Sequence, residues 1–79
     1  MDDRQWTDLK ISLKKTIGEN TFNNWLSPID FSHVEEDVAI FKVPTNFLGN
    51  YVSQNFSEII VAQISSKINK INRIRFEVD

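Results

Sequence analysis

Several residue types that build reactive sites are absent or scarce in this 79-residue sequence. It has no cysteine, one histidine and two glycines. Without cysteine there is no disulfide framework and no cysteine-based zinc site. The single His33, followed by the acidic run 35–37, is typical of a hairpin turn and has no second nitrogen or sulfur ligand beside it. Gly18 and Gly49 are too far apart to form a phosphate-binding glycine loop. We therefore expect no enzyme activity, no cofactor and no metal site.

The chain also lacks long apolar runs and a strong charge of one sign. No segment approaches the roughly 20 apolar residues of a membrane span. The charged start, "MDDRQWTDLK", does not resemble a signal peptide. A formal net charge of −2 argues against general binding of polyanions, although basic residues can still gather locally. The length and the ordinary hydrophobic content of 41% predict one soluble, cytoplasmic domain over residues 1–79.

Two helices are expected in the first third of the chain. In residues 2–17, apolar side chains recur at spacings of three and four from Trp6 onward, and the segment ends at Gly18. Residues 19–26 predict a short second helix, which stops because the residue before Pro28 disfavours helical backbone. Its apolar residues include Trp25, which we expect in the core. Trp6 fits a core position too, but its place near a free chain end also suits a partly exposed interface anchor.

Strand patterns follow the second helix. Residues 29–33 alternate in polarity, and after the polar segment "EED" the run "VAIFKV", residues 38–43, is rich in β-branched and aromatic residues. These two segments predict a hairpin whose second strand is central and at least partly covered on both faces. A third strand is expected in "RIRFEVD", with Ile74, Phe76 and Val78 facing inward. Periodicity alone leaves open whether it pairs parallel or antiparallel.

A long helical pattern covers residues 45–70, and it raises a question about two adjacent apolar residues. Successive residues on a helix are about 100° apart, so Phe47 and Leu48 cannot both face the core. Leu48 continues the main apolar stripe, which predicts that it is buried. Phe47 lies at the edge of that stripe beside Tyr51, so we weigh a role in partner binding against a core role.

The order helix, helix, strand, strand, helix, strand predicts an α+β fold with three helices packed on a three-stranded sheet. Basic side chains gather near the C-terminus and are a candidate nucleic-acid contact, although a solvated helix end and strand face is the simpler interpretation. They are Lys67, Lys70, Arg73 and Arg75.

The ordered motifs resemble domain I of the bacterial replication initiator DnaA. An N-terminal tryptophan, then "TFNNWLSPI", then "FKVPTNFLGNYV" and a final "IRFEV" carry the resemblance, which spans nearly the whole chain. It implies a KH-like fold. It also implies contacts with other initiator molecules, with the replicative helicase and with regulators of initiation. Weak single-strand binding is a secondary implication, because the chain lacks the G-x-x-G loop of KH domains.

Residue roles follow from the same resemblance. Trp6 matches a tryptophan implicated in self-association, and Phe47 matches an aromatic residue that contacts the helicase. Thr21 stands where some members carry an acid that shares this contact. We expect Thr21, Asn46 and Tyr51 to flank Phe47. Two alternatives stay open: a KH-like binder of single-stranded nucleic acid, and a stand-alone adaptor that regulates an initiator.

Overall fold

Two helices and a π-helical turn form the N-terminal third of the chain. The structure is a computed structural model that describes residues 1–68 and 70–79. Helix α1 (Asp3–Ile17) begins with a reciprocal cap, in which the side chain of Asp2 accepts from the Gln5 N–H and the side chain of Gln5 accepts from the Asp2 N–H. It ends at Gly18, whose φ of 96° suits glycine. Helix α2 (Glu19–Thr21) then continues directly into the π-helix η1 (Phe22–Leu26).

The three predicted strands form one mixed sheet. Strand β1 (Asp30–Glu35) pairs antiparallel with β2 (Val38–Val43), and β3 (Arg73–Val78) pairs parallel with β2. The order β1-β2-β3 makes β2 central, as its apolar pattern predicts, and settles the direction of the third strand. The hairpin and the α+β order of elements are therefore confirmed.

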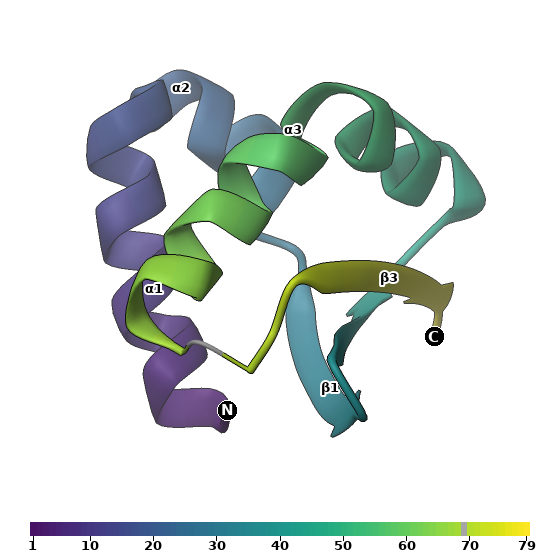
Figure 1. The fold of residues 1–79 in the computed structure, drawn as a ribbon. Coiled ribbons are helices and arrows are strands. Elements are labelled where there is room, and N and C mark those ends of the chain that lie inside the picture. The colour runs from purple at the N-terminus through teal and green to yellow at the C-terminus, as the bar shows by residue number, and fades with distance from the viewer. Residues whose placement is uncertain (69) are drawn as a thin grey trace.

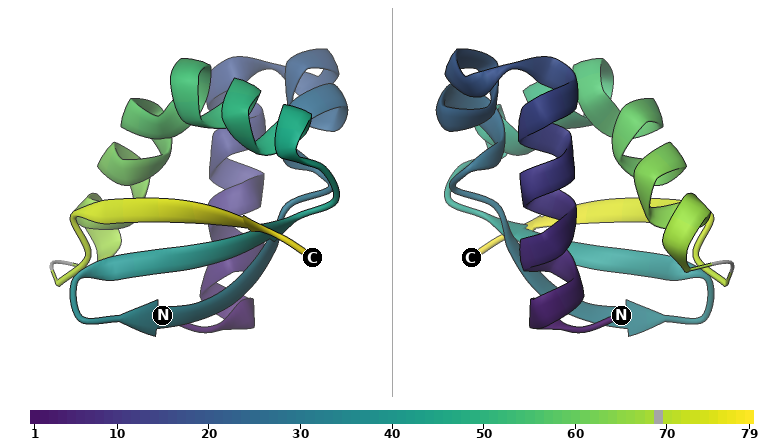
Figure 2. Two further views of the ribbon diagram at one scale, coloured as in Figure 1. Left: turned by 90° about the vertical axis from the view of Figure 1, so that its right-hand side faces the viewer. Right: turned by 90° about the vertical axis from the view of Figure 1, so that its left-hand side faces the viewer.

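Helix α3 (Asn46–Lys67) links the hairpin to β3. Thr45 caps it by accepting a hydrogen bond from the Leu48 N–H at 3.1 Å. The helix ends at Lys67, earlier than the predicted range of 45–70, and residue 69 in that range lies outside the described residues. Figure 2 shows α1 crossing one face of the sheet and α3 arching over β3, while the other face is open. In Figure 1 the chain can be followed through all these elements.

The core lies between the helices and the inner face of the sheet. Helix α1 supplies Trp6, Leu9 and Leu13, and β2 supplies Ala39, Phe41 and Val43. The remaining buried members are Phe22, Leu26, Ile29, Leu48, Val52, Ile60, Ile64 and Ile71. Leu48 is buried as predicted. Val78 is in register with Val43 on the inner face, as predicted, but it lies at the end of β3 with 44% of its surface exposed.

Trp6 is fully integrated into this core. Its side chain is only 4% exposed, its ring centroid lies 4.6 Å from that of Phe41, and its indole N–H donates to the carbonyl of Ile29 at 3.1 Å. The ammonium of Lys10 lies 5.6 Å from the ring centroid and donates to the carbonyl of Ser27. Burial lowers the pKa of Lys10, and the nearby charge of Asp30 opposes that shift. The core interpretation of Trp6 is therefore confirmed and that of a partly exposed anchor is wrong, because the ring packs on Phe41 and Lys10 lies over it.

Candidate functional site

An aromatic patch of Trp25, Phe47 and Tyr51 lies where η1 meets the start of α3. Phe47 is 71% exposed, which confirms that it lies outside the core stripe. The rings of Trp25 and Tyr51 are stacked, with centroids 3.7 Å apart and planes 13° apart. The Phe47 ring lies 6.2 Å from Trp25 and 6.5 Å from Tyr51. Phe56 extends the patch inward, 6.1 Å from Tyr51.

Trp25 belongs to this patch, although the sequence suggests a core position for it. Its side chain is half-buried and leans against Tyr51 from the outside of the core. The π-turn explains the position. The Ser27 N–H donates to the Phe22 carbonyl at 2.9 Å, a bond five residues long, so each residue advances less around the axis than in an α-helix. Phe22 and Leu26 therefore stay on the core side while Trp25 turns toward α3.

Three residues are expected around Phe47, and the structure places each of them at a different site. Tyr51 lies in the patch as predicted. Thr21 is half-buried at the end of α2, directly before the turn that carries Trp25, and supplies no charge. Asn46 lines a separate groove between α3 and β3, together with Asn50 and Ser53. Its expected role beside Phe47 stays a prediction, because lining this groove does not test it.

The predicted basic strip does not form a continuous row of free cations. Lys67 ends α3 and Lys70 is exposed in the turn that follows, whereas Arg73 and Arg75 lie on the open face of the sheet. The guanidinium of Arg75 is 2.9 Å from Glu77 and 3.6 Å from Glu35. These acids neutralise it locally, which weakens the case for a phosphate-binding strip.

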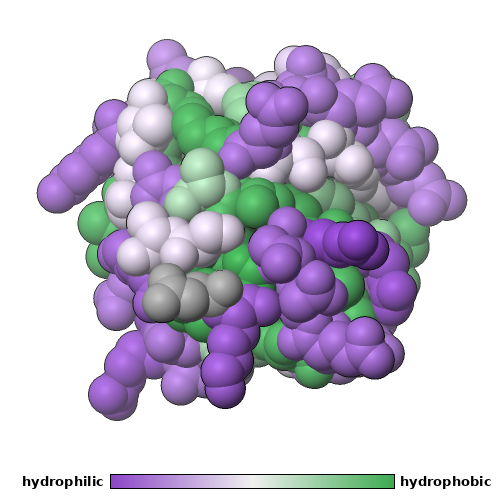
Figure 3. Space-filling view, in the orientation of Figure 1, coloured by the Kyte–Doolittle hydropathy of each residue, from purple (hydrophilic) through white to green (hydrophobic). Residues whose placement is uncertain are grey.

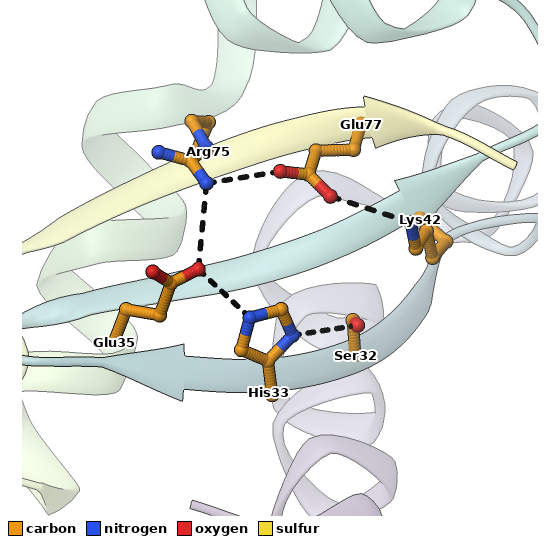
Figure 4. Close-up of polar contacts among 6 residues, drawn as sticks. All are labelled: Ser32, His33, Glu35, Lys42, Arg75 and Glu77. Atoms are coloured by element: carbon orange, nitrogen blue, oxygen red, sulfur yellow. Dashed lines mark hydrogen bonds and ion pairs between the residues drawn. The ribbon is translucent and has the colours of Figure 1, made fainter.

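Arg75 is part of a polar network that crosses all three strands (Figure 4). His33 bridges Ser32 and Glu35 on β1 with contacts of 2.9 Å each, and Glu77 accepts from Lys42 of β2 at 3.3 Å. Hydrogen bonds from Arg75 and then from Lys42 lower the pKa of Glu77. Ile40 is fully buried at the centre of this face, in register with His33 and Arg75. On the open face, hydrogen-bonded polar and charged side chains therefore surround the buried Ile40.

The described residues offer little for reactive chemistry. Within residues 1–68 and 70–79, no group of three or more histidine, cysteine or acidic side chains is arranged to hold a metal ion. Across the same residues no helix has the length and apolar content needed to cross a membrane. The feature that stands out chemically is the exposed aromatic patch.

Comparisons with known proteins agree with the resemblance. Residues 3–66 match the model of the DnaA N-terminal domain. The chain is 46% identical over 78 residues to the chromosomal replication initiator protein DnaA of Roseobacter denitrificans and 44% identical to that of Ruegeria pomeroyi. In both cases the match covers 99% of this chain and 17% of the relative, so the chain spans about a sixth of their length.

The fold has a solved counterpart. A structure described as a HobA–DnaA (domain I-II) complex from Helicobacter pylori matches with a TM-score of 0.81, over 92% of this chain and 94% of that chain, at 14% identity. At this identity the match establishes the fold, which is that of DnaA domain I. The family model and the similarity to curated initiators establish more: this chain belongs to the DnaA N-terminal domain family.

Proposed function

We propose that this chain is a protein-interaction module of a replication initiator, acting by adhesion and not by catalysis. In this proposal the aromatic patch of Trp25, Phe47 and Tyr51 binds the replicative helicase and regulators of initiation at the origin, in the cytoplasm. Weak self-association brings initiator molecules together. The observation that carries the proposal is the 71% exposure of Phe47 beside a rigid aromatic stack.

The geometry of the patch suits an interface anchor. Aromatic residues are enriched among the few side chains that dominate binding energy, and rigid rings lose little conformational freedom on binding. The stack of Trp25 on Tyr51 fixes two of the three rings before a partner arrives. A patch this small gives a transient contact, and several initiators on one origin would strengthen it through avidity.

The printed description of the solved relative supports a protein partner. That structure contains DnaA domains I and II in complex with HobA. The fold is therefore one on which a protein partner can dock. For this chain we extend the idea to regulators of initiation as a class and to the helicase. The uncharged Thr21 leaves the contact mainly apolar.

Binding to the purified replicative helicase of the same organism tests the proposal, measured by surface plasmon resonance. Phe47→Ala should weaken binding by about tenfold or more, since interface anchors contribute about 2 kcal/mol or more. Ile11→Ala is the matched control, because Ile11 is another exposed apolar residue, 55% exposed on α1. Equal effects of the two substitutions, or none, would refute the assignment of the patch.

Self-association is the part of the proposal that the burial of Trp6 changes. Trp6 packs on Phe41, and its indole N–H donates to the Ile29 carbonyl. Because it is buried, Trp6 would act on self-association by stabilising the structure beneath the contact surface and not by contacting the partner. We expect sedimentation velocity to detect weak dimers of the wild type at high concentration. Trp6→Ala should lower the free energy of unfolding and, with it, the fraction of dimer. A Trp6→Ala variant that stays as stable as the wild type and still loses the dimer would contradict this internal role.

A further inference from the structure

A groove of about 210 Å³ lies between the first two turns of α3 and strand β3. Asn46, Asn50 and Ser53 line its helical side. Gly49 lets the helix approach the sheet, because a Cβ atom there would lie 3.1 Å from Cγ2 of Val43. These positions share one face of α3. Phe47 and Tyr51 leave the helix on another, so the groove is separate from the aromatic patch.

The groove follows the edge of β3. The lining residues of this strand point to both sides of the sheet, with Ile74 and Phe76 inward and Arg75 outward, so their common side is the strand edge. Within the described residues β3 pairs only with β2. The backbone N–H and C=O groups on its other edge therefore have no strand partner.

The helical wall offers hydrogen-bonding groups as well. Among the described residues the side chains of Asn46, Asn50 and Ser53 form no hydrogen bond, whereas Asn55 on the opposite side of α3 bonds the Tyr51 carbonyl. Between the two rows, Ile74 and Phe76 of β3 contribute apolar side chains to a groove whose surface is otherwise mainly polar. Figure 3 shows one face of the molecule, on which apolar surface lies at the centre with hydrophilic side chains around it.

We propose that this groove binds an extended peptide segment of another protein, which adds to β3 as a fourth strand beneath α3. Strand addition to a sheet edge gives affinity through main-chain hydrogen bonds, and alternate side chains enter the groove. Antiparallel addition along residues 73–77 engages about five peptide residues, given a rise of roughly 3.4 Å per residue. The side chains that enter the groove should be small and apolar, to contact Ile74 and Phe76.

A positive charge at the start of β3 favours one orientation of the bound peptide. Arg73 begins β3 and forms no ion pair among the described residues, whereas Arg75 and Glu77 are already paired with each other. An acidic residue at the C-terminal end of an antiparallel peptide would lie across from Arg73. Opposite charges directly across two strands stabilise the pair. The preferred occupant is therefore a short alternating segment that ends in an acid.

Two other occupants fit less well. A nucleic acid needs unpaired cations along its backbone and exposed rings for stacking, but the groove is lined by neutral polar groups and by Arg75, which Glu35 and Glu77 neutralise. The β3 strand of a second copy carries its own α3 over the same edge. Pairing β3 of one copy with β3 of another would make the two α3 helices clash.

Titration of the ¹⁵N-labelled chain with the capped peptide acetyl-Thr-Val-Thr-Val-Glu-amide, followed by NMR at millimolar concentrations, tests the proposal. We expect amide shifts in β3 and the first two turns of α3, and slower hydrogen exchange at alternate β3 amides. Asn50→Trp should fill the groove and weaken binding by about tenfold or more. Asn55→Trp is the matched control, because it places the same ring on the opposite side of α3. Arg73→Glu should reverse the preference between peptides ending in glutamate and in lysine.

Several results would overturn the proposal. One is equal binding of the peptide with proline at its centre, since proline removes an N–H that strand addition needs. Others are shifts confined to the aromatic patch, no response of β3 at all, or an equal loss with Asn55→Trp. Stronger movement of the same amides by oligothymidylate would assign the groove to nucleic acid. None of these outcomes depends on whether Phe47 binds the helicase.

Discussion

The free energy of unfolding of Phe47→Ala distinguishes two roles for Phe47, a binding residue on the surface and a residue of the core. Full burial of a phenylalanine side chain contributes about 1.5–3 kcal/mol relative to exposure. Phe47 keeps 71% of its surface exposed, and its nearest rings, Trp25 and Tyr51, lie beyond 6 Å between centroids. Less than a third of the burial energy is therefore at stake, which is roughly 0.5–1 kcal/mol.

Urea denaturation followed by tryptophan fluorescence gives the free energy of unfolding for this test. The expected loss of at most about 1 kcal/mol corresponds to a drop in Tm of about 4–8 °C or less for a domain of this size. The slope of the free energy against urea should not change, because the surface exposed on unfolding is nearly the same. Phe41→Ala is the reference, since Phe41 is fully buried and its truncation should cost about 3–5 kcal/mol.

The reasoning is refuted if Phe47→Ala loses as much stability as Phe41→Ala. Such a result would mean that Phe47 is a core residue in solution. Weaker helicase binding by Phe47→Ala would then be explained by unfolding of the variant. A near-neutral Phe47→Ala that also binds the helicase like the wild type would leave the fold intact and remove the proposed function. Stability and binding must therefore be measured on the same variant.

Three further predictions concern stability. Trp25→Ala should stay folded and lose about 1–2 kcal/mol in the same urea assay, because the half-buried ring gives up its stack on Tyr51 and part of its burial; complete unfolding would assign Trp25 to the core. Gly49→Ala should lower the Tm despite alanine's helix preference, since its Cβ would lie 3.1 Å from Cγ2 of Val43. Gly49→Ala should cost less in a Val43→Ala chain than in the wild type, because Val43→Ala removes the methyl group that the new Cβ meets. The lowered pKa of Glu77 stabilises the fold above the ordinary glutamate value of about 4.3, and this contribution is lost as the pH falls through the folded-state pKa. The difference in urea midpoint between wild type and Glu77→Gln should therefore shrink with acidification, and a constant difference would exclude this linkage.

Much of the fold could be predicted because its elements follow simple periodicities. The three-and-four spacing from Trp6 locates α1, and alternation locates β3. The direction of β3 could not be predicted, because inward and outward alternation is the same for parallel and antiparallel pairing. The C-terminal end of α3 was placed too late for a related reason: the apolar residues Ile68 and Ile71 continue the spacing after the helix has ended at Lys67.

Burial of Trp6 shows why position along the chain is a weak guide to exposure. A residue near a free end has few covalent neighbours, yet α1 is anchored by its cap at Asp2 and lies across the sheet. Lys10, one turn later, closes the outer side of the ring by bonding the Ser27 carbonyl. The Lys10 bond to Ser27 and the Trp6 bond to Ile29 join elements distant in sequence, so periodicity within α1 carries no signal of them.

The site could be predicted only in the part that regular helix geometry governs. On α3 that geometry separates Phe47 from Leu48, and the structure bears this out. In residues 22–26 the same geometry is misleading, because the backbone winds as a π-turn with no distinctive sequence. Normal α-helical winding would keep Trp25 nearer the core side of Phe22. The wider turn moves it onto Tyr51, and the patch depends on that irregularity: restoring a regular helix there, by deleting one residue of the turn, should bury or displace Trp25 and leave Phe47 without its rigid neighbour.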